Sequence, residues 1–155
     1  MSIVQELKLL KVTSALHLAH LNVLFTSGYI HGKIAQILKP FQLTVEQFNV
    51  LRILKGANDT HLCIRDITCR MIDRNSNVSR IVDKLEAHHY VRRSPSNEDK
   101  RANEVLLTEK GLNLITEITE IVQPQFNKLL NLTEEEAKDL NHLLDKARSR
   151  DATKC

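Results

Sequence analysis

The chain has 155 residues with 42% hydrophobic and 4% aromatic content, no Trp, and a formal net charge of +3 at pH 7. This length and apolar content are enough for a core of aliphatic side chains, so folding should not depend on disulfides, and the abundance of Leu, Ile, Val, Glu and Lys favours a mostly helical fold. Residues 1–6 lack a basic start followed by an apolar stretch, and later apolar runs are short, so we expect a cytoplasmic protein with no membrane contacts.

The first predicted element is one long helix from about Thr13 to Lys39, which Pro40 should end. Gly28 and Gly32 lie inside it and lower its helix propensity, which indicates close packing against a neighbour. The apolar residues with helical spacing are Leu18, Leu21, Phe25, Ile30, Ile34 and Ile37.

A second helix should begin after Thr44, because Thr44 and Gln47 have the spacing of a capping box, and it should end near Gly56. Its expected buried residues are Phe48, Leu51 and Leu54.

The next two helices are short and joined by a tight link at residues 72–74, which is the arrangement of a helix-turn-helix. The first of them carries Ile64, Ile67 and Met71. The second has an apolar face of Val78, Ile81, Val82 and Leu85, and an opposite face of Ser76, Arg80, Asp83 and Ala87.

Residues 90–94 and 103–107 have the pattern of two β-strands joined by a polar, charged loop. The expected inward positions are Val91, Val105 and Leu107. This hairpin is the predicted wing of a winged helix-turn-helix.

Two further helices are predicted after the hairpin. Thr108 can cap the first, which Pro124 should kink, and Thr133 with Glu136 repeats the capping-box pattern before the second. The expected apolar stripes are Leu112, Ile115, Ile118, Val122, Phe126 and Leu129 in the first, and Leu140, Leu143, Leu144 and Ala147 in the second.

The positive charge is concentrated in one segment. Residues 70–101 contain eight basic and five acidic residues, whereas basic and acidic residues balance in the remainder, so the whole net charge of +3 lies within this fifth of the chain. Such a local excess is typical of a surface that binds a polyanion.

Residues 43–111 resemble the MarR family of bacterial regulators, named for multiple antibiotic resistance. Residues 43–51 (LTVEQFNVL) are similar to a helix opening of that family, and residues 78–86 (VSRIVDKLE) to its recognition helix. Residues 99–101 match its wing-tip pattern of Asp, any residue, Arg, and residues 105–111 (VLLTEKG) follow as in the family.

The resemblance implies a homodimer, with residues 43–111 as the winged helix-turn-helix core and residues 1–39 and 112–150 as the helical dimerisation region. It also implies a palindromic double-stranded DNA operator, a repressor as the expected type of regulator, and a small-molecule or redox signal that relaxes DNA binding. One departure from the family lies in the turn at residues 72–75, where the more usual pattern is Gly-Val-Ser. Here Asp73 or Asn75 could cap the recognition helix.

The first two turns of a helix in the major groove present side chains to base edges. The candidates for this role are Asn75, Ser76, Asn77, Ser79 and Arg80. Arg80 could bind a guanine in two places and Asn77 an adenine. Arg74, at the front of the helix, is expected on a backbone phosphate.

In the wing, Arg101 could enter the narrow minor groove while Asp99 holds its side chain, and Lys100 could contact phosphates. The alternative for both the helix and the wing is an ordinary solvated, charged surface.

Two other classes of function fit the sequence less well. An enzyme is disfavoured, because the sequence has no phosphate-binding glycine loop and no nucleophile motif. A winged helix that binds protein would need an apolar patch in place of Arg80 and Arg101.

The remaining signals are weak. Cys63, Cys69 and Cys155 have no paired spacing, so we expect no disulfide framework and no metal or other cofactor, although Cys63 or Cys69 could sense oxidants. His17, His20 and His31 lack the partners of a zinc site and fit surface or structural roles. From the family's geometry alone, Tyr29 and His31 could line an effector pocket.

Overall fold

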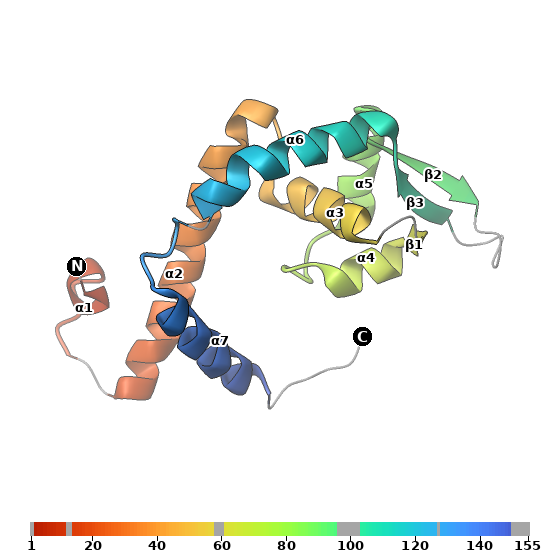
Figure 1. The fold of residues 1–155 in the computed structure, drawn as a ribbon. Coiled ribbons are helices and arrows are strands. Elements are labelled where there is room, and N and C mark those ends of the chain that lie inside the picture. The colour runs from red at the N-terminus through yellow and green to blue at the C-terminus, as the bar shows by residue number, and fades with distance from the viewer. Residues whose placement is uncertain (1, 12–13, 58–60, 96–102, 127, 150–155) are drawn as a thin grey trace. The chain divides into compact units, whose positions relative to one another are not determined.

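The computed structural model describes residues 2–11, 14–57, 61–95, 103–126 and 128–149 (Figure 1). It is mostly helical with a small antiparallel sheet, which confirms the predicted fold class. The chain divides into two compact units, residues 1–45 and 46–155. Among the helices of the described ranges, none combines the length and apolar character needed to cross a membrane.

The first unit is built around the predicted long helix. It contains α1 (Ile3–Glu6), α2 (Ala15–Leu38) and the 3₁₀ helix η1 (Lys39–Phe41). Ser14 caps α2, since its hydroxyl accepts a hydrogen bond from the backbone N–H of His17 at 3.1 Å. Pro40 lies in η1, and α2 ends just before it, as expected of a residue without a backbone N–H. The predicted start at Thr13 lies outside the described residues.

Among the described residues of this chain, the expected close packing at Gly28 and Gly32 is not found. A Cβ added at either glycine would meet no atom within 4 Å. The reason is that the elements contacting α2 in its unit are the short α1 and η1, which are too small to cover a helix of 24 residues. Several large apolar side chains of α2 are therefore exposed: Leu16, Val23, Leu24, Phe25 and Tyr29.

The second unit holds the predicted helix-turn-helix. Its helices are α3 (Val45–Gly56), α4 (Ile64–Arg70) and α5 (Val78–Ala87). Of the apolar side chains predicted for these helices, Ile64 and Ile81 are half-buried. The others are buried, namely Phe48, Leu51, Leu54, Ile67, Met71, Val78, Val82 and Leu85. Burial of this apolar set stabilises the helix-turn-helix through the hydrophobic effect.

The sheet has the order β1-β3-β2 and is antiparallel throughout. The predicted hairpin is β2 (Val91–Pro95) and β3 (Asn103–Leu107), with Val91 opposite Leu107 and Pro95 opposite Asn103. Val91 and Val105 are buried and Leu107 is half-buried. The unpredicted strand β1 (Leu62–Cys63) pairs Leu62 with Val105 and gives the sheet its third strand.

The helix α6 (Glu109–Phe126) begins where predicted. The Thr108 hydroxyl accepts a hydrogen bond from the Gly111 N–H at 3.0 Å, which is a side-chain cap. A Cβ on Gly111 would lie 1.9 Å from the carbonyl oxygen of Tyr90, so glycine permits the close approach of α6 to the start of β2. Leu112 belongs to the predicted apolar stripe but is 45% exposed, because the buried stripe runs through Gly111, Ile115, Ile118 and Val122.

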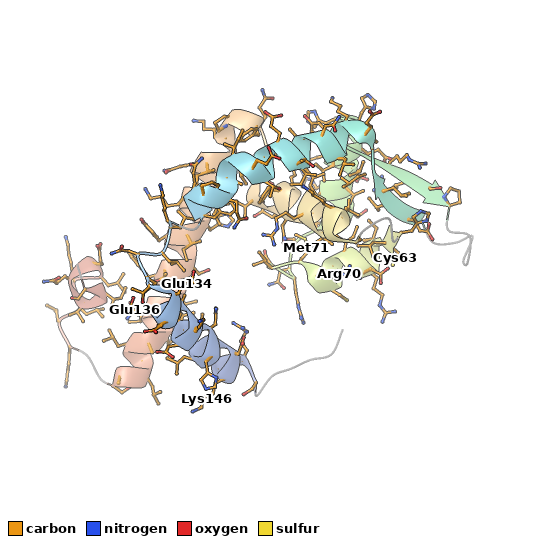
Figure 2. All side chains as sticks on the ribbon, viewed as in Figure 1. Cys63, Arg70, Met71, Glu134, Glu136 and Lys146 are labelled. Carbon is orange, nitrogen blue, oxygen red and sulfur yellow. The ribbon has the colours of Figure 1, made fainter. Side chains whose placement is uncertain are left out.

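The helix α7 (Glu134–Arg148) confirms the second capping box. Glu136 accepts from the Thr133 N–H at 2.8 Å, and this backbone hydrogen bond, followed by the one with the Thr133 hydroxyl, lowers the pKa of Glu136. Figure 2 shows Glu134 and Glu136 at the start of the helix and Lys146 toward its end, charges that suit the helix dipole. No residue of α7 is buried, and Leu143 in its predicted apolar stripe is 60% exposed.

Candidate nucleic-acid interface

The turn between α4 and α5 is organised by Asp73. Its carboxylate accepts from the Asn75 N–H at 3.0 Å and from the Ser76 hydroxyl at 3.3 Å, and its carbonyl accepts from the Ser76 N–H at 3.2 Å. Asp73 therefore folds the turn and does not cap the helix that follows.

The cap of α5 is Asn77, whose Oδ1 accepts from the Arg80 N–H at 3.1 Å. The expected capping by Asp73 or Asn75 is wrong, because the Asp73 carboxylate accepts hydrogen bonds within the turn and the helix starts only at Val78. Asn75 and Ser76 thus precede the helix. A two-point hydrogen bond to adenine would also need Oδ1 of Asn77 as an acceptor. Asn77 could therefore bind adenine in this way only by giving up its cap of α5.

The predicted base-reading side chains gather on the exposed side of this turn and helix. Arg74, Asn75, Asn77, Ser79 and Arg80 are exposed and Ser76 is half-buried. The opposite side of α5 is buried in the core through Val78, Val82 and Leu85. A surface of short hydrogen-bonding side chains beside two arginines can contact both base edges and phosphates.

Asn49 on α3 anchors the start of this turn through a hydrogen bond, and sequence reasoning missed it. Its Oδ1 accepts from the Ile72 N–H at 3.0 Å, and the residue is only 7% exposed. The one signal in the sequence is a polar residue inside the apolar stripe of α3. The hydrogen bond joins α3 to the first residue of the turn before the recognition helix.

Arg93 on β2 joins the wing to α5, and this link was also missed. Its backbone N–H donates to Glu86 Oε1 at 2.9 Å, its Nη1 to Glu86 Oε2 at 2.5 Å, and its Nη2 to the Asp83 carboxylate and, at 3.4 Å, to the Ser79 carbonyl. The hydrogen bond to Asp83 is the main cause of the raised pKa of Arg93, so the guanidinium stays charged. Nothing in the sequence distinguishes Arg93 from its neighbour Arg92.

The wing tip lies outside the described residues, and with it Asp99, Lys100 and Arg101. The strands β2 and β3 on either side are described. At the far edge of the sheet, His61 Nδ1 lies 2.5 Å from Glu104 Oε2, which ties the residue before β1 to β3.

The two described cysteines, Cys63 and Cys69, are half-buried and form no disulfide. Cys63 is at the start of α4 (Figure 2), where its backbone N–H donates to the Asp66 carboxylate at 3.0 Å. Hydrogen bonds from Cys63, first from its side chain and then from its backbone, lower the pKa of Asp66. Cys155 is not among the described residues.

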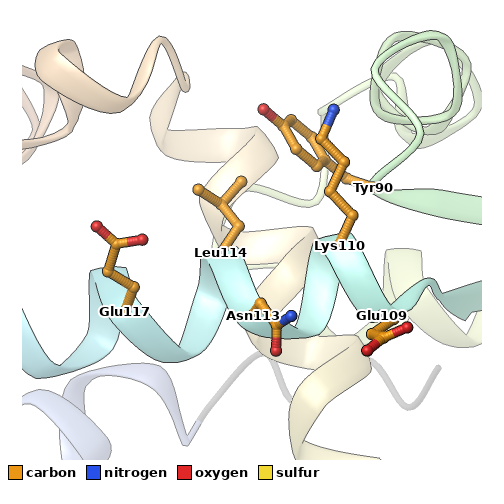
Figure 3. Close-up of a pocket in the computed structure, with 6 residues that line it drawn as sticks. All are labelled: Tyr90, Glu109, Lys110, Asn113, Leu114 and Glu117. Carbon is orange, nitrogen blue, oxygen red and sulfur yellow. The ribbon is translucent and has the colours of Figure 1, made fainter.

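One pocket of about 500 Å³ lies where α6 begins, and Figure 3 shows its lining. Lys110 Nζ lies 4.9 Å from the centroid of the Tyr90 ring and donates to the His88 carbonyl at 3.0 Å. The other lining residues are Glu109, Asn113, Leu114 and Glu117. Tyr29 and His31 are exposed residues of the other unit. Within the described ranges, no three His, Cys, Asp or Glu residues are grouped as metal ligands.

The family model that matches this chain is that of the MarR family, over residues 43–102. The HTH-type transcriptional repressor IacR of Pseudomonas putida is 31% identical over 121 residues, which cover 75% of this chain and 71% of the repressor.

Two solved structures are similar in fold. The S. aureus MepR–DNA complex has a TM-score of 0.75 at 25% identity and covers 90% of this chain and 99% of MepR. A mutant E. coli MarR complexed with operator DNA has a TM-score of 0.73 at 25% identity and covers 81% of this chain and 89% of MarR.

Proposed function

Because the chain belongs to the MarR family, we propose that it is a sequence-specific transcription regulator that binds a palindromic double-stranded DNA operator as a homodimer. The family consists of transcription regulators. Because one relative of this chain is a transcriptional repressor, repression is the proposed mode of regulation. The protein would act in the bacterial cytoplasm, where the chromosome lies, and catalysis has no part in this function.

The observation that carries the proposal is the exposed surface from Arg74 to Arg80. The buried stripe of α5 fixes which side of the helix is exposed, and the Asn77 cap fixes where the helix begins. A helix held in this way can enter a major groove with its N-terminal residues leading.

Within this surface, Arg80 and Ser79 are the principal base-reading residues, and Asn75, Ser76 and Asn77 contact bases or phosphates from the turn. Arg74 contacts a backbone phosphate, which adds affinity without selecting sequence. In the wing, Arg101 enters the minor groove with Asp99 orienting it, and Lys100 contacts phosphate.

The dimer is formed by the helices outside the residue 43–111 core, that is, by residues 1–39 and 112–150. The support is that a single chain leaves large apolar side chains exposed on α2, α6 and α7, among them Leu24, Ile121 and Leu143. An effector that alters the dimer region would change the spacing of the two recognition helices and so release DNA.

The proposal is tested by selecting duplexes from a random-sequence library with the full-length protein at moderate salt. We expect enriched sites with inverted symmetry and half-sites about 10 base pairs apart, because two recognition helices of a dimer face successive major grooves. Failure to enrich any sequence would contradict it and favour a winged helix that binds protein.

A further inference from the structure

We propose that Arg93 is a positioning residue for DNA recognition: it holds the wing at a fixed angle to the recognition helix and neutralises two carboxylates of that helix. This inference rests on the DNA-binding function proposed above. Arg93 lies on β2 and its partners lie on α5, so the link runs between the two parts that are expected to contact DNA.

The geometry is that of a clamp. Arg93 donates to Ser79, Asp83 and Glu86, which are spaced four and three residues apart and therefore share one face of α5 over two turns. Both the backbone N–H and the guanidinium of Arg93 donate these hydrogen bonds. The clamp therefore holds the backbone of β2 as well as the Arg93 side chain. Since β2 is one of the two strands of the wing, a change of its angle to α5 would move the wing relative to that helix.

The charges support a second effect. Asp83 lies one turn from Arg80 on α5, and the side chains of Asp83 and Glu86 are 59% and 37% exposed. Without Arg93, both carboxylates would repel phosphates within a Debye length, about 8 to 10 Å at physiological salt. The Arg93 side chain is 24% exposed, so its ion pairs are less open to solvent on the side of the guanidinium than on the side of Asp83.

The chemistry requires arginine at this position. A guanidinium has five N–H donors in a planar fork and can serve two carboxylates and a carbonyl together, whereas the compact ammonium of lysine cannot match this arrangement. Because these acceptors already engage the guanidinium, Arg93 should not act as a phosphate contact. The number of phosphates that the protein neutralises, and hence the number of counterions released, should therefore not depend on Arg93.

The test uses the full-length protein and two duplexes, the operator selected from the library and a scrambled version of it. Affinity for each is measured over a range of salt concentrations for the wild type, R93A, R93K and R93A/D83N. The double variant keeps the net charge of the wild type but lacks the clamp. R92A is the matched control, because it removes the same charge from the neighbouring, exposed position of β2. Thermal unfolding followed by circular dichroism establishes that each variant is folded.

We expect R93A to lose about 10-fold in operator affinity, with a smaller loss on the scrambled duplex and a salt slope that falls by much less than about 0.9, the value expected for a lost phosphate contact. R93A/D83N should regain affinity for the scrambled duplex but not discrimination, and R93K should also discriminate poorly although it keeps the charge. R92A should weaken binding to both duplexes equally.

Three results would overturn the inference: wild-type affinity in R93A, a salt slope lowered by about 0.9 in R93A, which marks a direct phosphate contact, or full recovery of operator affinity in R93A/D83N. Wild-type protein that prefers no sequence would instead contradict the proposed function itself, and the two failures are thereby distinguished.

Discussion

At the scale of single residues, Arg74 and Arg80 are both exposed, but they stand at different places on the proposed interface. Arg80 is in the first turn of α5, where side chains reach base edges, whereas Arg74 belongs to the turn before the helix. Their substitution should therefore have different consequences.

Arg80→Ala is expected to weaken operator binding by about 1 to 3 kcal/mol and to broaden sequence preference, because the proposed two-point bond to guanine would be lost. Arg74→Ala should weaken binding to every duplex and lower the salt slope by about 0.9, since the one proposed phosphate contact would be lost. Fluorescence anisotropy with the operator and with single-base variants of it measures both effects. An equal loss of discrimination in the two variants would contradict this division of roles.

Asn49 is a residue whose contribution is to stability. Asn49→Ala should lower the free energy of unfolding by about 1 to 3 kcal/mol, because the Ile72 N–H loses its acceptor and a nearly buried side chain is truncated. Asn113→Ala, at an exposed position of α6, should change it by no more than about 0.5 kcal/mol. Urea denaturation of both variants is the measurement, and equal effects would refute the role given to Asn49.

At the scale of elements, the junction of β2 and α6 depends on Gly111. Gly111→Ala should destabilise the protein by about 1 to 3 kcal/mol, because the new methyl group would overlap the Tyr90 backbone and force the helix and strand apart. This cost exceeds the gain in helix propensity, about 1 kcal/mol.

Gly56 provides the control with the opposite sign. It ends α3, and a Cβ there would meet no atom within 4 Å, so Gly56→Ala should stabilise the protein by about 0.4 to 1 kcal/mol. Thermal melting of the two variants side by side checks the pair. A stabilising effect of Gly111→Ala would show that the close approach is not needed.

The sequence was sufficient for elements that local signals define. Pro40 ended α2, Thr108 and Thr133 capped α6 and α7, and the apolar stripes of α3 and α5 identified the core of the helix-turn-helix. Such signals act within a few residues along the chain, which is why they can be read without a structure.

The features that were missed depend on contacts between distant segments. The strand β1 exists because Leu62 pairs with Val105, and Arg93 differs from Arg92 only because β2 turns it toward α5. The start of α5 was misjudged since Asp73, Asn75 and Asn77 are all good capping residues, and only the fold of the turn selects one of them.

At the scale of the whole molecule, a single chain leaves the apolar stripe of α7 exposed to solvent. Leu140, Leu143, Leu144 and Ala147 have the spacing of a packed helix face, yet no residue of α7 is buried. A second copy of the chain would remove such a stripe from water.

Leu143→Lys should weaken the dimer by at least about 10-fold, because burying a leucine contributes about 1.5 to 3 kcal/mol. Asn141→Lys adds the same charge two residues away, on another side of α7, and should leave dimerisation nearly unchanged. Sedimentation equilibrium over a range of protein concentrations measures the association of both variants. A wild-type mass that stays at one chain at every concentration would contradict the dimer.

The proposed function of a dimeric DNA-binding regulator is tested most directly by binding of the wild-type protein to its selected operator and to a scrambled duplex, with the mass of the complex measured in the same samples. We expect two chains per operator and a preference of about 10³-fold or more for the operator at physiological salt. Equal affinity for the two duplexes, or one chain on a site without inverted symmetry, would contradict it.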